Sequence, residues 1–212
     1  MHVIALRHLQ FGQHLDLLSS MYRLRRRVFK DRLAWAVSLS SDLELDVYDT
    51  LSPTYLLLML NERDVVGCVR LLPTTGPTMV ANQFSSLLGG KPIPRSGRIL
   101  ESSRFCVDTK LADEPAGNGL ARATFLLFAA MIENLRAVGA DCIVTVTDTR
   151  IERILRRADW ELERIAPPQR LGDTMALAGF LHASDNALAS MYRNAGVAGP
   201  VLTELTACRD AA

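Results

Sequence analysis

The sequence predicts an α/β protein built on a mixed, twisted sheet that carries helices on both faces. Apolar segments of strand length alternate with segments of helical apolar spacing, in the order helix, antiparallel strands, long helix, strand, helix, strand. The stretch from Arg98 to Thr147 reads as a strand, a glycine loop, a helix and a second strand, which predicts a right-handed crossover. The chain has 212 residues, of which 49% are hydrophobic, and this fits a single domain over residues 1–212.

The first half of the chain is predicted to supply a strand, a helix and a hairpin. Apolar residues at near-helical spacing predict a helix over Leu15–Lys30, after a short strand at His2–Leu6. Thr54–Leu60 and Asp64–Leu72 read as two antiparallel strands joined by a turn. Residues 31–53 break both patterns with several serines and aspartates, and a loop of this length inside a domain is usually functional. We therefore expect residues 31–53 to form a mobile substrate loop.

The second half alternates strands with helices. Its best-defined feature is a long apolar helix over Leu120–Val138, which follows the glycines at 117 and 119 and is closed by Gly139. The other predicted elements are strands at Arg98–Val107, Asp141–Thr147, Leu162–Ile165 and Thr174–Phe180, and helices at Thr149–Ala158 and Asn186–Ala195.

The composition argues against several classes of function. Lysine and arginine number 24 and aspartate and glutamate 23, and this balance disfavours a chain-wide nucleic-acid-binding surface. The four cysteines form no CxxC pair, so we expect no metal site and no disulfide framework, and the first three, Cys68, Cys106 and Cys142, lie in apolar runs as small core side chains. No apolar run is long enough for a signal peptide or a membrane span. We expect a cytoplasmic protein that binds neither nucleic acid nor membrane.

Charged side chains interrupt the apolar segments of the first hundred residues. Arg70 lies within VVGCVRLLPTTGP, and Glu101 and Arg104 lie within LESSRFCV. Strand alternation places Glu101 and Ser103 on one face and Arg104 on the other, unless a bulge intervenes. A buried charge is costly unless it is paired. These residues therefore form either internal ion pairs, for example Arg70 with Glu101, or the wall of a site for a polar ligand.

The unusual segments follow one another in a definite order: LRRRVFKDRLAW, ELDVYD, VVGCVRLLPTTGP, Phe84, LESSRFCV and VTVTD. This series resembles the acyl-homoserine-lactone synthase family, the LuxI-type autoinducer synthases. The resemblance implies a GNAT-like acyltransferase fold and two substrates, S-adenosylmethionine and an acyl thioester carried by acyl carrier protein or coenzyme A. It also implies that the methionyl amine attacks the thioester. The methionyl carboxylate then displaces the sulfonium, which closes the lactone and releases methylthioadenosine. No cofactor is implied.

The resemblance also assigns residues of this sequence to the site. Seven side chains are expected to bind S-adenosylmethionine: Arg25, Phe29, Trp35, Asp46, Asp49, Arg70 and Phe84. Carboxylates suit the cationic part of that substrate, arginines the anionic part, and aromatic faces a sulfonium or an adenine. Three more are expected to take part in catalysis: Glu101, Ser103 and Arg104. Glu101 is the candidate general base, although a permanent pair with an arginine would lower its pKa and weaken it in that role.

Two further sets of residues are assigned to the acyl donor. Those expected along the acyl chain and pantetheine are Phe105, Val107, Met131, Val144, Thr145 and Val146, with plain core as the alternative. Backbone N–H groups near Phe105 are candidates for the oxyanion. The helix TRIERILRR places Arg150, Arg153 and Arg157 on one side, a candidate docking face for an acidic acyl carrier protein. The alternative is a solvated helix face on which Glu152 pairs locally.

Two other functions fit part of the pattern. Another GNAT-like N-acyltransferase that uses acyl-coenzyme A would share the second half of the chain, but it needs neither LRRRVF nor ELDVYD. A non-catalytic module that senses S-adenosylmethionine or an acyl carrier would keep the binding residues without the chemistry. Formation of an acyl-homoserine lactone separates the synthase from both.

Overall fold

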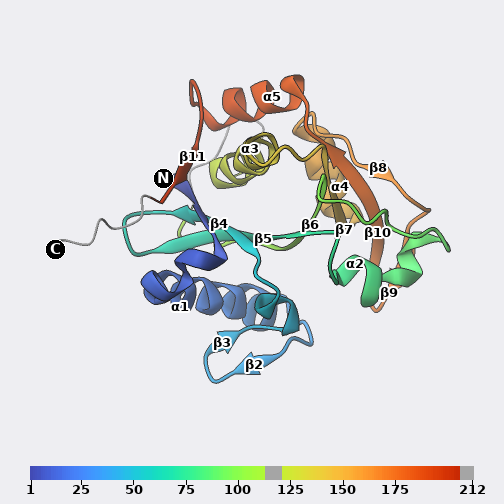
Figure 1. Cartoon of the computed structure of the whole chain (residues 1–212), viewed down its shortest axis with the longest axis horizontal. Helices are drawn as coiled ribbons and strands as arrows, with labels where there is room; N and C mark the ends of the chain where they lie inside the picture. The colour runs from blue at the N-terminus through green and yellow to red at the C-terminus, as the bar shows by residue number, and fades with distance from the viewer. Residues whose placement is uncertain (113–120, 206–212) are drawn as a thin grey trace.

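The computed structural model describes residues 1–112 and 121–205, and its centre is one long, twisted mixed sheet (Figure 1). Within these residues the strand order is β11-β1-β4-β5-β6-β7-β10-β8, and β9 pairs with β10. The β1–β11 and β6–β7 pairs are parallel and the other neighbouring pairs are antiparallel. The strands are β1 (His2–Leu6), β4 (Thr54–Met59), β5 (Val65–Pro73), β6 (Ile99–Val107), β7 (Cys142–Asp148), β8 (Glu163–Arg164), β9 (Gln169–Leu171), β10 (Thr174–His182) and β11 (Leu202–Glu204).

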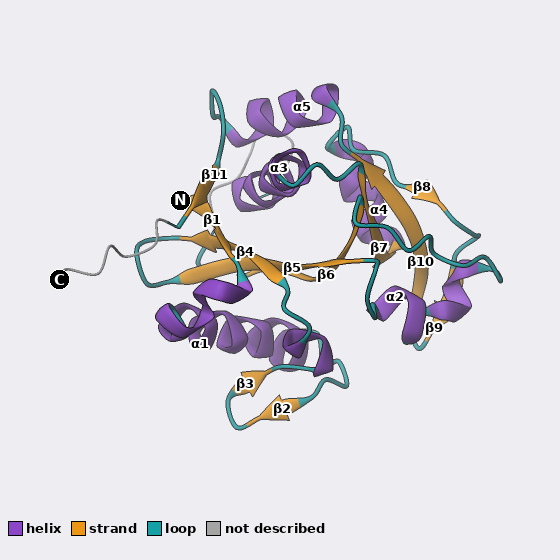
Figure 2. Ribbon diagram, viewed as in Figure 1, coloured by secondary structure: helices purple, strands orange, loops and turns teal. Residues whose placement is uncertain are grey.

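Helices cover both faces of this sheet, as the sequence predicts (Figure 2). On one face, α1 (Leu15–Arg25) runs directly into the π-helix η2 (Arg26–Arg32). On the other face lies α3 (Arg122–Ala137), with α5 (Asp185–Ala195) packed against it. The remaining short elements are the 3₁₀ helices η1 (His8–Gln13), η3 (Val47–Thr50) and η4 (Ser85–Leu88), the helices α2 (Met79–Asn82) and α4 (Thr149–Arg157), and the hairpin strands β2 (Leu39–Ser40) and β3 (Leu43–Glu44).

Strand alternation divides the core into two layers. Leu56 and Val69 belong to the layer that contains α3, whereas Leu57 and Cys68, their neighbours on the same strands, belong to the layer that contains α1. The layer around α3 is apolar. The layer around α1 also contains Arg70, whose side chain is fully buried. The charged side chain that the sequence places inside β5 therefore lies on the α1 face of the sheet.

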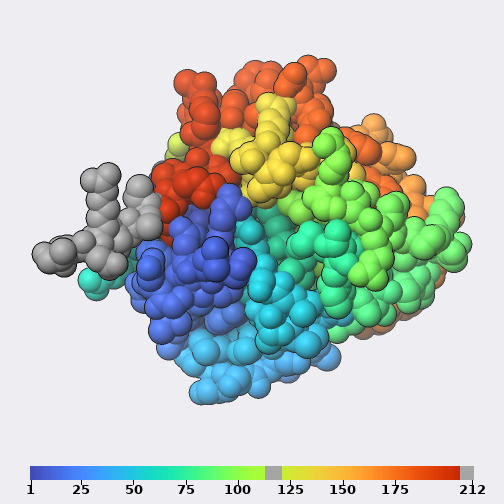
Figure 3. All heavy atoms as spheres, viewed as in Figure 1, coloured from blue at the N-terminus to red at the C-terminus, as the bar shows by residue number. Residues whose placement is uncertain are grey.

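The structure confirms most of the predicted elements and corrects two stretches. Residues 31–53, expected as a loop, contain the β2–β3 hairpin and η3; they include the light-blue surface at the bottom of the space-filling view (Figure 3). The helix expected over Leu15–Lys30 is α-helical only to Arg25, where it widens into η2. Such π-helical turns are rare and occur frequently at functional sites. The glycine loop expected before α3 lies outside the described residues, as does Cys208.

The three described cysteines, Cys68, Cys106 and Cys142, are free and buried, in agreement with their predicted role as small core residues. The Sγ atoms of Cys68 and Cys106 lie 3.5 Å apart across β5 and β6. Within residues 1–112 and 121–205, no helix combines the length and the apolar character that crossing a membrane requires.

Candidate active site

Three arginines and three carboxylates form a continuous network of ion pairs on the α1 face of the sheet. The arginines come from α1, β5 and β6, and the carboxylates all come from residues 31–53. The six side chains are at most 11% exposed: Arg25, Arg70, Arg104, Glu44, Asp46 and Asp49. In the described part of the chain, no three aspartate, glutamate, histidine or cysteine side chains form a group that could hold a metal ion.

The contacts of Arg25 and Arg70 meet at Asp49. Arg25 Nη1 and Nη2 donate to the two Asp49 oxygens at 2.7 and 2.9 Å, and its Nε donates to Glu44 Oε2 at 2.5 Å. Arg70 Nη1 donates to Asp49 Oδ1 at 2.8 Å and to Asp46 Oδ1 at 2.6 Å. Burial alone would raise the pKa of the Asp49 carboxyl, but the two arginines outweigh burial and hold that pKa well below its usual value.

Arg104 closes the network, and an irregularity in β6 makes this possible. Between two matched residue pairs of β5 and β6, β6 contains one residue more than β5. Arg104 has a φ of +56°, in the left-handed region that residues other than glycine rarely adopt. Its Nε donates to Glu44 Oε1 at 3.0 Å, and its Nη2 lies 2.7 Å from Asp46 Oδ2. Simple alternation, which separates Arg104 from Ser103, is therefore wrong here, and the bulge explains why.

The guanidinium of Arg70, which lies inside β5, is paired with carboxylates of residues 31–53. It binds Asp46 and Asp49, and its Nε donates to Ser103 Oγ at 3.1 Å. The pair of Arg70 with Glu101, offered as an example from the sequence, does not form. The strand then ends at Pro73, because proline has no N–H to continue the ladder.

Glu101 lies beside the network without being one of its ion pairs. Its Oε1 accepts the backbone N–H of Val80, in α2, at 2.5 Å. Its Oε2 is buried and accepts no hydrogen bond from any residue that the structure describes. Burial raises the pKa of this carboxyl above its usual value, against the opposing effect of the Val80 and Met79 N–H groups. Glu101 therefore carries one oxygen that is free to take a proton.

Aromatic side chains border the same region. Phe29 and Trp35 stack with ring centroids 5.2 Å apart, and the Arg104 guanidinium lies 5.6 Å from the Phe29 centroid. Trp35 is 50% exposed, so part of its ring is accessible. Phe84 packs against Met79, whose Sδ accepts hydrogen bonds from two arginines of the network. The ten residues assigned from the sequence to S-adenosylmethionine binding and catalysis thus belong to one region.

Sequence reasoning missed Glu44 as a member of the site. Its side chain is fully buried between Arg25 and Arg104, so it joins α1 to β6. A signal was present, because Glu44 is the first residue of ELDVYD and lies two positions before Asp46. Residues two apart in an extended segment point to the same side, which is where both arginines lie.

The six residues assigned to the acyl chain are divided between the two faces of the sheet. Phe105, Val107 and Met131 belong to the layer around α3, where Phe105 stacks on Phe128 with centroids 5.1 Å apart. Val144 and Val146 pack with the cluster on the opposite face. Thr145 Oγ1 donates to the carbonyl of Ser102 at 3.2 Å. The structure therefore does not bring the six together in one pocket.

β6 and β7 separate along their length. They pair in parallel only as far as Ser102 and Thr145, although β6 continues to Val107 and β7 to Asp148. The two strand ends beyond this point do not pair with each other. A splayed pair of this kind leaves backbone groups of both strands available to a ligand.

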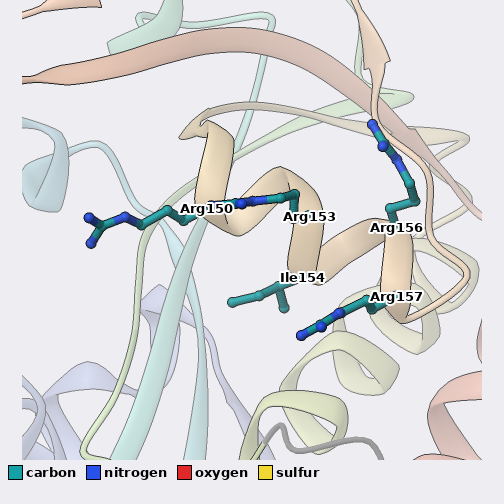
Figure 4. Close-up of a pocket in the computed structure, with 5 residues that line it drawn as sticks. All are labelled: Arg150, Arg153, Ile154, Arg156 and Arg157. Atoms are coloured by element: carbon teal, nitrogen blue, oxygen red, sulfur yellow. The ribbon is translucent and has the colours of Figure 1, made fainter.

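The arginines of α4 gather around a pocket of about 460 Å³. Figure 4 shows its lining: Arg150, Arg153, Ile154, Arg156 and Arg157. The local pairing considered for Glu152 is wrong, since Glu152 accepts two hydrogen bonds from Arg164 of β8 at 2.5 and 2.7 Å. Within the described residues, no carboxylate lies within 4 Å of the four α4 guanidinium groups. The helix therefore presents four arginines that form no ion pair with a described residue.

Removing the central carboxylate should destabilise the protein in a pH-dependent way. We expect Asp49→Asn to lower the free energy of unfolding by about 3 kcal/mol at pH 7, because two buried arginines lose their shared charge partner. The pKa of Asp49 is lowered by folding, so its contribution is present above the unfolded value of about 3.9 and is lost as the pH falls. Urea unfolding should therefore show a smaller difference in free energy of unfolding between the wild type and Asp49→Asn at pH 3 than at pH 7.

The matched control is Asp141→Asn, which removes a carboxylate from an exposed pair with Arg98. We expect little change in stability for this variant at either pH. Equal losses for the two variants, or a loss for Asp49→Asn that is as large at pH 3 as at pH 7, would contradict the central role of Asp49.

Known proteins share both the sequence and the fold. Residues 10–191 match the sequence profile of the autoinducer synthase family. A probable acyl-homoserine-lactone synthase of Sinorhizobium fredii is 46% identical over 183 residues, which cover 86% of this chain and 88% of that protein. Among solved structures, the acyl-homoserine-lactone synthase LasI has a TM-score of 0.77 at 32% identity and covers 93% of this chain and 98% of its own.

The coenzyme A-dependent acyl-homoserine lactone synthase BjaI has a TM-score of 0.87 at 22% identity, over 99% of this chain and 95% of its own. That likeness concerns the fold, which is GNAT-like. The sequence match covers 86% of the chain and the structural likeness 93–99% of it. The chain therefore belongs to the autoinducer synthase family and is an enzyme of the acyltransferase class, an acyl-homoserine-lactone synthase.

Proposed function

We propose that the enzyme makes its lactone from S-adenosylmethionine and an acyl thioester in two steps. In the first, the methionyl nitrogen bonds to the thioester carbonyl carbon, the C–S bond breaks, and the amine proton passes through Glu101 to the departing thiolate. In the second, a methionyl carboxylate oxygen bonds to the γ-carbon, and methylthioadenosine leaves with the electron pair of the C–S bond. Neither step changes an oxidation state, and both leaving groups are activated already, so we propose no cofactor.

The observation that carries this proposal is the unpartnered Oε2 of Glu101. An amine can attack only when it is neutral, so a base must hold its proton. The pKa of Glu101 is raised by burial, which makes its carboxylate a better base than an exposed glutamate. Because Glu101 forms no ion pair with any residue that the structure describes, its remaining oxygen is available to an amine or to one bridging water.

The ion-pair network is proposed as the wall that binds S-adenosylmethionine. Carboxylates and arginines alternate along the network, because each carboxylate is paired with arginines. The carboxylates suit the ammonium of the substrate and the arginines suit its carboxylate. The half-exposed Trp35 ring, stacked on Phe29, suits the adenine or the sulfonium. Residues 31–53 are proposed to close over the bound substrate and exclude water, which protects the thioester from hydrolysis.

The acyl donor is proposed to enter where β6 and β7 separate. Backbone N–H groups near Phe105, which lies beyond the last residue pair of β6 with β7, suit the oxyanion that forms on the thioester carbonyl. Phe105 and Met131 belong to the apolar layer around α3, and we propose that the acyl chain of the thioester extends toward this layer. BjaI, which shares the fold, has been solved with S-adenosylmethionine and isopentyl-coenzyme A, so the fold accommodates both kinds of molecule in that protein.

The α4 arginines are proposed to dock the carrier of the acyl group. The four arginine side chains that line this pocket bring positive charge, which suits either an acidic carrier protein or the phosphates of coenzyme A. Because Glu152 is held by Arg164, it does not neutralise them. The free cysteines fit a reducing compartment, and we propose that the enzyme works in the cytoplasm.

The reaction itself is tested with the purified protein, S-adenosylmethionine, and a series of acyl carrier protein and coenzyme A thioesters. We expect mass spectrometry to find one acyl-homoserine lactone and one methylthioadenosine for each S-adenosylmethionine consumed. The most active thioester identifies the carrier and the chain length. Acylation of another amine without lactone would instead identify a different N-acyltransferase, and binding without turnover would identify a sensing module.

Replacing the proposed base should slow acylation much more than it weakens binding. We expect Glu101→Gln to lower the single-turnover acylation rate by about 100-fold or more, because general-base catalysis contributes on this scale. The Kd for S-adenosylmethionine should change less than about threefold, since glutamine keeps the side-chain length and the acceptor for the Val80 N–H. An unchanged acylation rate in stopped-flow experiments would remove Glu101 from this role.

Reversing charge on α4 should weaken the use of the acyl donor through electrostatics. We expect Arg153→Glu combined with Arg157→Glu to raise the KM for the donor about tenfold at low salt and to leave the KM for S-adenosylmethionine unchanged. The effect should fade at about 0.5 M salt, because screening shortens the reach of charge. The control reverses Arg63 and Arg193, which lie outside α4. A KM that does not respond to salt would rule out the docking role.

A further inference from the structure

Tyr55 of β4 contacts the ion-pair network through a hydrogen bond to Asp49. It lies in β4 directly opposite Arg70 of β5, and its side chain is fully buried. Its ring stacks on Phe11 with centroids 5.4 Å apart. Its hydroxyl donates to Asp49 Oδ1 at 2.6 Å, the oxygen to which Arg25 and Arg70 also donate. A single phenol therefore reaches the carboxylate on which two guanidinium groups meet.

The hydroxyl is held as a donor. Burial, followed by the negative charge of Asp49, raises the pKa of Tyr55 far above its usual value, so the phenol keeps its proton. The Tyr22 hydroxyl lies 3.4 Å from the Tyr55 hydroxyl, and the Tyr22 ring lies 5.3 Å from the Arg25 guanidinium carbon. Contacts with Asp49, Tyr22 and Phe11 therefore hold the Tyr55 side chain in place.

The contribution of this hydroxyl is geometric. Three arginines already match three carboxylates, so the network needs no neutral donor to balance its charge. With Tyr55, Asp49 Oδ1 receives three donors, while Oδ2 receives Arg25 and the backbone N–H of Asp46, at 2.8 Å. A carboxylate with donors in all these directions cannot rotate without breaking several hydrogen bonds.

We propose that Tyr55 is a positioning residue for S-adenosylmethionine. By fixing the rotation of the Asp49 carboxylate, it fixes the Arg25 and Arg70 guanidinium groups and the Asp46–Asp49 segment against the sheet. It acts through Asp49 and does not touch the substrate. This inference rests on the proposed use of the network as the wall for that substrate.

The test is Tyr55→Phe, which deletes one oxygen and keeps the ring that packs on Phe11. We expect the KM for S-adenosylmethionine to rise about tenfold, which corresponds to about 1.4 kcal/mol. The KM for the acyl thioester and kcat should change less than about threefold. Backbone hydrogen exchange at Asp46 should accelerate, because its N–H is bonded to the carboxylate that loses its anchor.

Tyr192→Phe is the matched control for the loss of a tyrosine hydroxyl that donates to a carboxylate. Tyr192 lies on α5, on the opposite face of the sheet, and its hydroxyl donates to Glu133 Oε1 at 2.8 Å. We expect both variants to lower Tm by a few degrees, about 3 °C. The control should keep both KM values and the exchange rate at Asp46.

The two readouts separate the possible failures. If the wild-type enzyme makes no lactone, the proposed function fails, and exchange at Asp46 still decides whether Tyr55 positions Asp49. If the wild type is active and Tyr55→Phe changes both KM values equally, changes neither, or leaves exchange at Asp46 as in the control, the positioning role is overturned.

Discussion

Everything at the site depends on the mutual burial of three guanidinium groups and three carboxylates. A buried charge that loses its partner costs several kcal/mol, so each member of the network is held in place by the others. The carboxylates come from residues 31–53, whereas the arginines come from α1, β5 and β6. The contacts that neutralise charge are therefore also the contacts that attach this segment to the sheet, and the shape of the substrate wall follows from them.

Local departures from regular structure occur where the network needs them. α1 widens into a π-helix immediately after Arg25, and β6 gains an extra residue at Arg104, which adopts a left-handed backbone. Such conformations cost of order 1–3 kcal/mol and persist only where the surroundings enforce them. Here the surroundings are the ion pairs themselves. β6 and β7 also separate nearby, so the irregular region contains both the proposed base and the proposed entry for the thioester.

Most of the fold was predictable because periodicity reports burial directly: the hairpin, the long helix and the layered sheet follow from apolar spacing. That the ten residues assigned to substrate binding and catalysis lie in one region was predictable from an ordered series of motifs. The face occupied by Arg104 was not, because a bulge leaves no mark on alternation. The partners of Glu44 and Glu152 were not predictable either, because the sequence offers many arginines and does not show which of them folds against each carboxylate. The acyl-chain candidates were chosen for their apolar character, which does not tell which face of the sheet a side chain occupies, and they lie on both faces.

The network joins parts of the chain that are far apart. Arg25 and Arg104 both bind Glu44, and the latter contact spans 60 residues. Long loops must close before such contacts can form, and this slows folding. A chain that had formed only α1 and the β4–β5 hairpin would still lack Arg104, the partner that Glu44 and Asp46 share. The charged centre is therefore complete only when α1, residues 44–49, β5 and β6 have all come together.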